Sequence, residues 1–238
     1  MGKVLTVARR ELAGYFFSPM AYAVGCLFLL ASGLWFFYSI FIPGSEASLR
    51  PLFEGMAYIM VFAVPLLTMR LISEEYRGGT IETLMTAPIS DTQVILGKFL
   101  GVLVFYLVLL ASTGAFLALI CIYGQPDAGI AAMGYLGLTL IGSTFIAVGL
   151  FASTLSRYQI VSAVIAAAIL AVFSILMQLL VSHASEPWNY IASYLNAMTY
   201  FKDFSRGVFD SRGVVYFLSS TALFLFLSVK TLESQRWR

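Results

Sequence analysis

The residues that could do chemistry are few, and they match no common catalytic pattern. The only histidine is His183, and the chain contains neither an HExxH pair of zinc ligands nor a GxSxG nucleophile turn. Gly97 and Lys98 precede Phe99 and lack the upstream glycine of the GxxxxGK phosphate-binding loop. The sequence therefore predicts no catalytic residue, no metal site and no cofactor in this chain, so any energy for its work must come from a partner.

The most polar part of the chain is the segment Arg70–Lys98, with the sequence RLISEEYRGGTIETLMTAPISDTQVILGK. Gly78-Gly79 breaks the preceding helix, and Thr80 can cap a new short helix with Glu82 near its positive end. Pro88 ends that helix, and apolar residues at i, i+3, i+4 spacing form one patch on it: Ile81, Leu84 and Met85. This pattern favours docking into a partner's groove. The alternative is a solvated connector that lies against the membrane surface.

The composition places this segment in a membrane protein. Of the 238 residues, 60% are hydrophobic and only 11% are charged, against roughly 25% charged in an average soluble domain. A chain of this size has too little interior to bury so much apolar surface, which excludes a soluble enzyme. The net charge of +2 is too small to indicate binding to nucleic acid. We expect a single all-α integral membrane domain over residues 1–238.

Six apolar windows are long enough to cross a bilayer, which takes about 20 helical residues. Their middles contain no Asp, Glu, Lys, Arg or His, and this argues against an ion-coupled carrier. In chain order the windows are Met20–Ile42, Leu52–Met69, Phe99–Tyr123, Ala128–Ser153, Ile160–Val181 and Val214–Val229.

The distribution of basic residues predicts the orientation of these spans. With the N-terminus inside, the inner segments contain ten Lys and Arg and the outer segments four. Since cytoplasmic loops are enriched in these residues, we expect both termini in the cytoplasm.

The first 18 residues predict an amphipathic helix at the membrane surface. At 100° per residue one face is apolar, Lys3, Thr6 and Arg10 lie opposite, and Pro19 marks the break before the first span. The apolar face consists of Val4, Leu5, Ala8, Leu12, Tyr15 and Phe16. The alternative is a cytoplasmic extension of the first span.

Small residues inside the fourth and fifth windows allow helices to approach closely. The fourth contains four glycines and the fifth several alanines: Gly134, Gly137, Gly142, Gly149, Ala163, Ala166, Ala167 and Ala168. They indicate either a subunit interface or packing within one bundle, and the sequence leaves both open.

The outer-side loop 182–212 also has a helical pattern. Apolar residues recur at i, i+3, i+4 and i+7. Asp203 and Arg206 are at i, i+3 spacing and Arg206 and Asp210 at i, i+4 spacing, so that these side chains could form ion pairs on a helix. The recurring residues are Ile191, Tyr194, Leu195 and Met198, and the aromatic residues suited to the membrane interface are Trp188, Tyr190, Tyr200, Phe201, Phe204 and Phe209. The alternative is an ordinary surface loop with exposed aromatic residues.

Arg70–Lys98 resembles the signature of ABC-2-type ABC transporter permeases: an arginine, a Glu-Glu pair, an arginine, Gly-Thr, a leucine, a proline and a Gly-Lys that opens the next span. Within that class the chain is most similar to the gliding-motility permease group, whose C-terminal region resembles Tyr200–Trp237. The two matches cover just over a quarter of the chain.

The resemblance implies a fold and a set of partners. Two six-helix subunits, either two copies or this chain with a paralogue, would each meet a cytoplasmic ATPase subunit, and the ATPases would bind ATP and Mg. The first and fifth spans would face the other subunit, and short re-entrant helices would follow the fifth span on the outer side. The expected location is the bacterial inner membrane.

The resemblance also implies roles for individual residues. Thr80–Ala87 would be the coupling helix that docks on the ATPase, and the turn Ser153–Gln159, with Arg157, would make a smaller contact. A polar gate would contain Arg70, Glu74, Glu75 and Arg77. The function implied is ATP-driven export of a substrate that the sequence does not name. The alternative is an ATPase-driven scaffold for a cell-envelope or motility machine.

Overall fold

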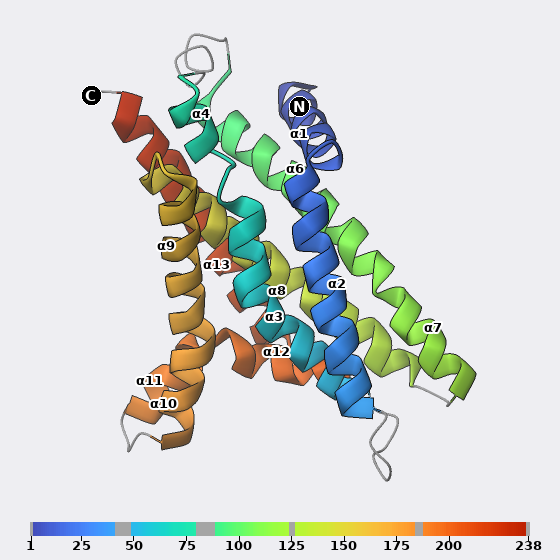
Figure 1. Cartoon of the computed structure of the whole chain (residues 1–238). Coiled ribbons are helices and arrows are strands. Elements are labelled where there is room, and N and C mark those ends of the chain that lie inside the picture. Colours follow the sequence, from blue (N-terminus) through green and yellow to red (C-terminus); the bar gives the residue numbers. More distant parts are fainter. Residues whose placement is uncertain (1, 41–48, 80–88, 124–126, 184–187, 237–238) are drawn as a thin grey trace.

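The computed structural model describes residues 2–40, 49–79, 89–123, 127–183 and 188–236. Throughout these ranges the regular secondary structure is helical and no strand occurs, so the all-α fold class is confirmed (Figure 1). The helices are α1 (Gly2–Phe16), α2 (Pro19–Ile40), α3 (Arg50–Thr68), α4 (Ser73–Arg77), α6 (Asp91–Ser112), α7 (Gly114–Tyr123), α8 (Ala128–Leu155), α9 (Gln159–Ala171), a π-helical turn (Val172–Leu176), α10 (Met177–His183), α11 (Trp188–Leu195), α12 (Ala197–Ser205) and α13 (Ser211–Arg236).

All six predicted membrane spans are present as helices of sufficient length and hydropathy. The spans are α2, α3 continuing through a turn into α4, α6 with α7, α8, α9 with the π-helical turn and α10, and α13. Helix α1 and the C-terminal end of α13 lie at one end of the bundle, and α11 and α12 lie at the other (Figure 1). We refer to these as the α1 end and the α11 end.

Local sequence signals set the starts of several helices. Ser90 and Gln93 form a capping box at the start of α6, in which each side chain accepts a hydrogen bond from the other residue's backbone N–H. Asp127 accepts from Gly129 N at 2.8 Å before α8, and Asn196 accepts from Met198 N at 2.9 Å before α12. These side chains satisfy N–H groups that a helix start leaves without an intrahelical acceptor.

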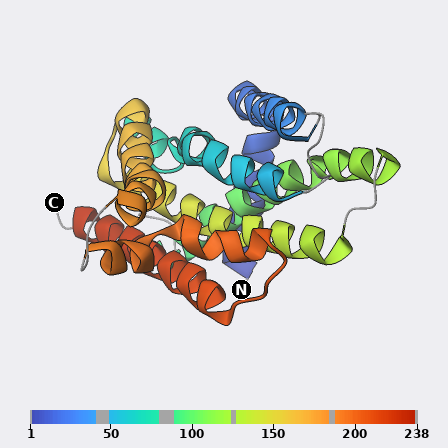
Figure 2. The same cartoon turned by 90° about the horizontal axis from the view of Figure 1, so that it is seen from below.

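Helix α8 is the most buried span and lies with α3 in the middle of the bundle, between α9 on one side and α6–α7 on the other (Figure 2). Its glycines face large side chains of neighbouring helices. A Cβ atom added at Gly134 would lie 2.2 Å from the Phe53 ring, and one at Gly142 would lie 2.5 Å from the Tyr106 ring. The small residues of the fourth span therefore serve packing within one bundle, which decides between the two interpretations of that span.

We predict that Gly149→Ala destabilises the bundle. The added Cβ would lie 2.0 Å from Thr68 Oγ1 and 2.7 Å from Thr68 Cβ, so no rotation of the Thr68 side chain relieves the contact. Overpacking of this kind costs about 1–3 kcal/mol, which should lower the midpoint of thermal unfolding in detergent. Gly114→Ala is the matched control, because nothing lies within 4 Å of a Cβ at that position. An equal midpoint for the two variants would contradict the α3–α8 contact.

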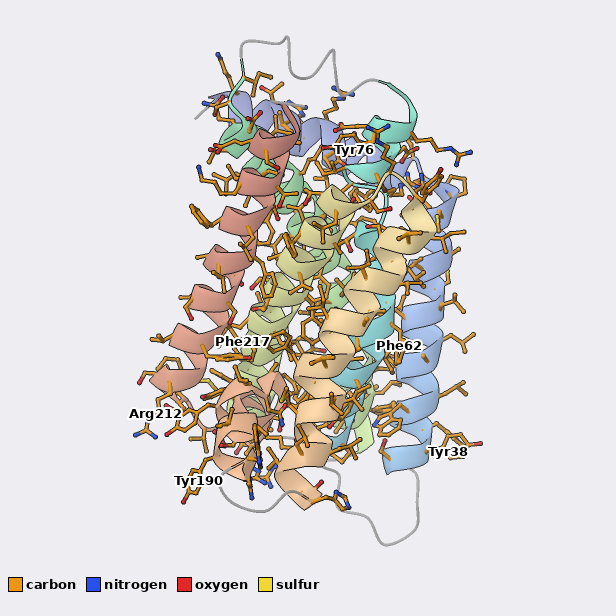
Figure 3. The ribbon with its side chains drawn as sticks, turned by 90° about the vertical axis from the view of Figure 1, so that its left-hand side faces the viewer. Tyr38, Phe62, Tyr76, Tyr190, Arg212 and Phe217 are labelled. Atoms are coloured by element: carbon orange, nitrogen blue, oxygen red, sulfur yellow. The ribbon has the colours of Figure 1, made fainter. Side chains whose placement is uncertain are left out.

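Helix α1 lies across the ends of the spans and does not continue α2 (Figure 3). The alternative that the first 18 residues form a cytoplasmic extension of the first span is therefore wrong. The helix is present as predicted, but its apolar face is divided. Ala8 and Tyr15 are buried, whereas Leu5 is 69% exposed and Phe16 is also exposed. The buried side of α1 packs against α6, a contact that hydropathy does not indicate.

The segment between the fifth and sixth spans forms two helices instead of one continuous amphipathic face. Asn196 separates α11 from α12: it caps α12, and its Nδ2 donates to Gln178 Oε1 at 2.9 Å. Consequently Ile191 and Tyr194 are exposed on α11, while Met198 is buried on α12. The predicted single i, i+3, i+4, i+7 face is therefore wrong, although both halves are helical.

Candidate functional site: a polar cluster at the α1 end

The polar cluster starts where α3 ends. After Thr68 the chain makes a turn over residues 69–72 and then forms α4. Ser153, near the end of α8, holds this turn: its Oγ accepts from Ile72 N at 2.9 Å and from Ser73 N at 3.2 Å, and it donates to Met69 O at 3.2 Å. Because Ser153 is fully buried, one hydroxyl fixes the position of α4 relative to α8.

Two glycines of α6 allow α1 to approach closely. A Cβ added at Gly97 would lie 2.6 Å from Val7 Cβ, and one added at Gly101 would lie 2.8 Å from Glu11 Cβ and 3.0 Å from Ala8 O. Any larger residue at either position would push α1 away. The close approach brings Glu11 to the side chain of Lys98, which stands between the two glycines on α6.

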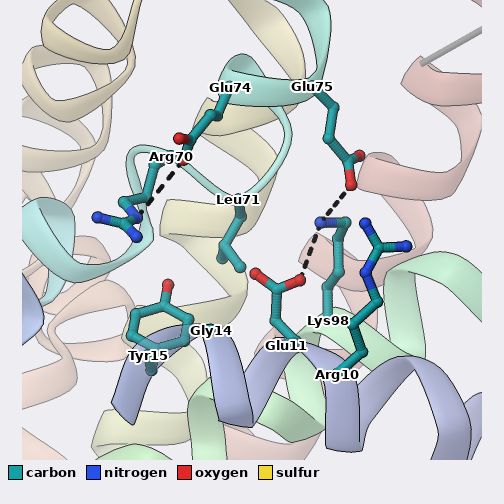
Figure 4. A pocket seen from close by; sticks show the side chains of 9 residues that line it. All are labelled: Arg10, Glu11, Gly14, Tyr15, Arg70, Leu71, Glu74, Glu75 and Lys98. Atoms are coloured by element: carbon teal, nitrogen blue, oxygen red, sulfur yellow. Dashed lines mark hydrogen bonds and ion pairs between the residues drawn. The ribbon is translucent and has the colours of Figure 1, made fainter. Parts of the chain in front are cut away.

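Lys98 joins three helices through ion pairs. Its Nζ lies 3.1 Å from Glu11 Oε2 on α1 and 2.9 Å from Glu75 Oε1 on α4, as Figure 4 shows. The Lys98 side chain is only 4% exposed, while those of Glu11 and Glu75 are 23% and 19% exposed. A lysine removed from water requires such partners to remain charged, so Glu11 and Glu75 compensate for its burial.

A second pair lies beside this triad. Arg70 Nε is 3.6 Å from Glu74 Oε2, and the guanidinium carbon lies 6.0 Å from the centre of the Tyr15 ring. The Tyr15 hydroxyl donates to Leu67 O at 2.6 Å. Burial, and after it the Glu11 carboxylate, raises the pKa of Tyr15. The hydrogen bond from the Tyr15 hydroxyl ties α1 to the end of α3.

These side chains surround a cavity of about 290 Å³ between α1, α4 and α6 (Figure 4). Its lining carries charges of both signs, which is unusual in a chain with so few ionisable residues. The lining residues are Arg10, Glu11, Gly14, Tyr15, Arg70, Leu71, Glu74, Glu75 and Lys98. We call this the polar cavity.

The structure brings together three of the four residues predicted to form a polar gate. Arg70, Glu74 and Glu75 line the polar cavity, whereas Arg77 is exposed at the end of α4 and lies outside it. The sequence analysis missed Glu11 and Lys98. The available signal was the position of Lys98, the eighth residue of a helix that begins at Asp91 and contains no further charge after Lys98, so that this lysine borders a stretch where a charge is costly.

The predicted coupling helix, with Thr80, Ile81, Glu82, Leu84, Met85 and Pro88, lies outside the residues that the structure describes. The segments that flank it, α4 and the start of α6, are both at the α1 end (Figure 1). Arg157 is exposed in the turn between α8 and α9, and α4 contacts α9. The charge of Arg157 acts on Tyr76 of α4. The predicted contact of Arg157 with an ATPase stays a prediction.

On the α11 end, the structure separates the predicted interfacial residues into two groups. Trp188, Tyr190 and Tyr194 are exposed, but Phe201 and Phe204 are fully buried. Phe201 and Phe204 are therefore core residues of α12, because α12 packs directly against α8. The prediction that these two side chains lie at the membrane interface is wrong.

Arg206 forms no ion pair with Asp203 or Asp210 in the described structure, so the expected pairing is wrong. Arg206 follows the last residue of α12 and is exposed. Asp210 Oδ1 instead accepts from Arg212 N at 2.8 Å, which places this carboxylate at the start of α13.

Over the described ranges, no three His, Cys, Asp or Glu side chains gather in an arrangement that could hold a metal ion. The polar cluster consists of salt-bridged carboxylates with their basic partners, and these ion pairs hold α1, α4 and α6 together.

Comparison with known proteins identifies the family. The family model described as "ABC-2 family transporter protein" matches residues 39–208, which is most of the chain. The chain is also 33% identical over 164 residues to a probable ABC transporter permease protein, NosY, from Pseudomonas aeruginosa. That alignment covers 62% of this chain and 58% of the relative, so the chain matches less than two thirds of the relative's length. The narrower resemblance to the gliding-motility group stays a prediction. The chain belongs to the ABC-2 family of transporter proteins.

Proposed function

We propose that this chain is the permease subunit of an ATP-driven exporter and that residues 80–88 transmit the work of a separate ATPase to the spans. The observation that supports this proposal is that buried polar side chains hold both segments that flank residues 80–88 in place. Ser153 holds the turn before α4, and Lys98 on α6 binds Glu75 on α4. Force applied between these anchored segments would reach α8 and α1 directly.

The proposed assembly contains two ATPase subunits, which bind ATP and Mg, and a second permease subunit. Helices α2 and α9 have large exposed apolar side chains, including Leu30, Trp35, Ile160 and Val164. These faces support a contact with the second subunit, though lipid would also cover them. The proposed site of action is the bacterial inner membrane, with the α1 end in the cytoplasm.

The orientation can be tested by labelling single cysteines. We expect Thr80→Cys and Ser185→Cys to react with a membrane-impermeant maleimide from opposite sides of the membrane, with Thr80→Cys protected in intact cells. The physical reason is the excess of basic residues in the segments at the α1 end. Protection of both cysteines, or reaction of both, in intact cells would contradict the proposed topology.

An ATP hydrolysis assay tests the proposal that a separate ATPase, and not this chain, hydrolyses ATP. We expect the purified chain alone to hydrolyse no ATP, because its sequence has no phosphate-binding loop. Hydrolysis should appear when the chain copurifies with a P-loop ATPase, and reconstituted vesicles should then move a solute or lipid. An active ATPase complex that moves nothing would favour the scaffold alternative over export. Hydrolysis by the chain alone, after removal of contaminants, would contradict the proposal that ATP is hydrolysed by a separate chain.

A further inference from the structure

The fifth span is interrupted by a turn of π-helix. Residues Val172–Leu176 form this turn between α9 and α10, and the backbone N–H of Met177 donates to Val172 O, five residues back. In an α-helix the acceptor is four residues back, so a π-helical turn accommodates one residue more than an α-helical turn. Turns of this kind are rare and are found mostly at functional sites. The fifth span therefore contains one residue that a regular α-helix of the same length would not hold.

The side chain of Ser174 shows that the π-helical turn is unfavourable locally. Ser174 is fully buried, and within the described residues its hydroxyl has no hydrogen-bond partner. In α-helical spans a hydroxyl can donate to the carbonyl four residues back, as Thr221 does at 2.8 Å, and a regular helix would offer Ser174 the carbonyl of Leu170. The buried hydroxyls of Ser32 and Ser162 also lack a partner, but they lie in regular α-helix, where rotation about χ1 alone reaches such a carbonyl. Other contacts must therefore hold the π-helical turn.

One side-chain hydrogen bond fixes the helix that follows the turn. Asn196 is fully buried; its Nδ2 donates to Gln178 Oε1 on α10 at 2.9 Å, and its Oδ1 accepts from Met198 N at the start of α12. Helix α10 also packs against α11, beside which it lies at the α11 end (Figure 1). Helix α12 is held in turn by α8. Gln178 therefore sets the orientation of α10 about its own axis relative to the rest of the bundle.

Conversion of the π-helical turn to α-helix would change the register of α10. The extra residue would add about 100° of rotation and about 1.5 Å of length, so each residue of α10 would take the place of the residue that now follows it. Gln178 would move to the place of Leu179, which is 53% exposed, and Met177 would face Asn196. The Gln178–Asn196 hydrogen bond would break, while Ser174 would gain an acceptor. The two registers therefore exchange one hydrogen bond for another.

We propose that the fifth span has two registers: the π-helical turn lets α10 rotate about its axis while α9 stays in place, and the Gln178–Asn196 hydrogen bond holds the register seen in the structure. Because Asn196 also caps α12, a movement of α11 and α12 acts directly on this hydrogen bond. The rotation is local, since α10 packs mainly against α11 and the π-helical turn, and it leaves the packing of α8 unchanged. This inference does not depend on the ATPase or on any transported substrate.

The experiment measures distances between pairs of spin labels in the full chain, reconstituted in bilayer nanodiscs and diluted with unlabelled chain. Cys26 and Cys121 are first replaced by alanine. Labels on Leu179→Cys and Val215→Cys report the position of α10 relative to α13, and labels on Val164→Cys and Val215→Cys report that of α9. The three labelled positions are 53%, 65% and 62% exposed, so the labels disturb little packing. A rotation of 100° moves a side chain ~5 Å from the helix axis by about 8 Å, which this measurement resolves.

Two variants remove the hydrogen bond that holds the present register. Asn196→Ser keeps an N-cap for α12 but is too short to reach Gln178, and Gln178→Met removes the amide at similar volume. Each should raise the population with a changed distance between positions 179 and 215 about two- to ten-fold, as expected for the loss of one hydrogen bond. Gln178→Met should have the larger effect, because an amide at the exposed place of Leu179 is unfavourable in lipid. Ser193→Ala is the matched control, since its hydroxyl bonds Tyr190 O within α11, and it should change neither distance.

Deletion of Val172 tests whether the π-helical turn is the part that moves. The deletion removes the extra residue, so α9 and α10 keep their places and α10 has no second register. We expect a single distance between positions 179 and 215, which the further change Asn196→Ser no longer alters. Deletion of Val161 from α9 is the control: Val161 and Val172 are similarly exposed, at 45% and 39%, but regular α-helix has no extra residue to lose. The thermal-unfolding midpoint should therefore fall more on deletion of Val161.

Three results would overturn the proposal. An unchanged distance between positions 179 and 215 in both Asn196→Ser and Gln178→Met would show that their hydrogen bond does not hold the register. A changed distance that persists after deletion of Val172 would place the movement outside the π-helical turn. An equal change in the distance between positions 164 and 215 would show that the fifth span moves as one rigid helix. None of these results requires the ATPase partner, so each is distinct from a failure of the proposed exporter function.

Discussion

Lys98→Met should destabilise the chain by about 3–5 kcal/mol, the typical cost of removing one partner from a buried ion pair. The variant leaves Glu11 and Glu75 facing each other where Nζ had been, with side chains only 23% and 19% exposed. Methionine fills a similar volume, so the loss reflects charge and not packing. We expect a large fall in the thermal-unfolding midpoint and faster proteolysis of α1, the helix that Lys98 ties to α6.

Lys230→Met is the matched control for this substitution. Lys230 Nζ lies 2.7 Å from Glu233 Oε2, a shorter distance than either contact of Lys98, but the Lys230 side chain is 56% exposed. Exposed pairs contribute at most about 1 kcal/mol, so the midpoint should barely move. Adding Glu11→Gln to Lys98→Met should restore part of the loss, because it removes one of the uncompensated carboxylates. Equal effects of Lys98→Met and Lys230→Met would show that burial does not decide the strength of these pairs.

Leu84→Asp should release the partner ATPase. The sequence places Leu84 on the apolar side of a helix too short to be stable alone, so its burial must come from a partner. Burying a leucine contributes about 1.5–3 kcal/mol, or on the order of 10- to 100-fold in affinity. The measurement is copurification of the two subunits from detergent.

Glu82→Ala is the control for that prediction. As a charge at the rim of the proposed contact it should weaken copurification less, by under about 1 kcal/mol. Membrane insertion of both variants has to be checked, and we expect it to be normal because both positions follow the span Arg50–Arg77 and precede the span Asp91–Ile122. If Leu84→Asp copurifies undiminished, the coupling contact lies elsewhere and the scaffold alternative becomes stronger.

The six spans could be predicted from the sequence because each is a local property. A bilayer selects any run of about 20 apolar residues regardless of its neighbours, so hydropathy alone located all six. The outer helices were predicted less well. Helical periodicity indicated helices over 188–205, but it could not show that Asn196 interrupts them or that Phe201 and Phe204 face α8.

The polar cluster was predicted only in part, for a similar reason. Arg70, Glu74 and Glu75 are neighbours in sequence, and the family resemblance drew attention to them. Glu11 and Lys98 are 87 residues apart, and nothing local shows that they meet. Their contact depends on Gly97 and Gly101, which let α1 pack onto α6. The glycines of α8 show the same limit of local sequence patterns. The sequence left open whether they form a subunit interface or pack within one bundle, and only their contacts with Phe53, Tyr106 and Thr68 decide for packing within the bundle.

The hydroxyl of Ser153 has a consequence for how the protein changes state. It binds three backbone groups of residues 69–73, and so it couples the segment before residues 80–88 to α8 without a hinge between them. Helix α8 packs against α3, α6, α9, α12 and α13, and packed interfaces of this kind switch between discrete arrangements instead of deforming gradually. We therefore expect a concerted transition of the whole bundle, with a high free-energy barrier and few intermediates. A sequential movement of one helix after another is not expected.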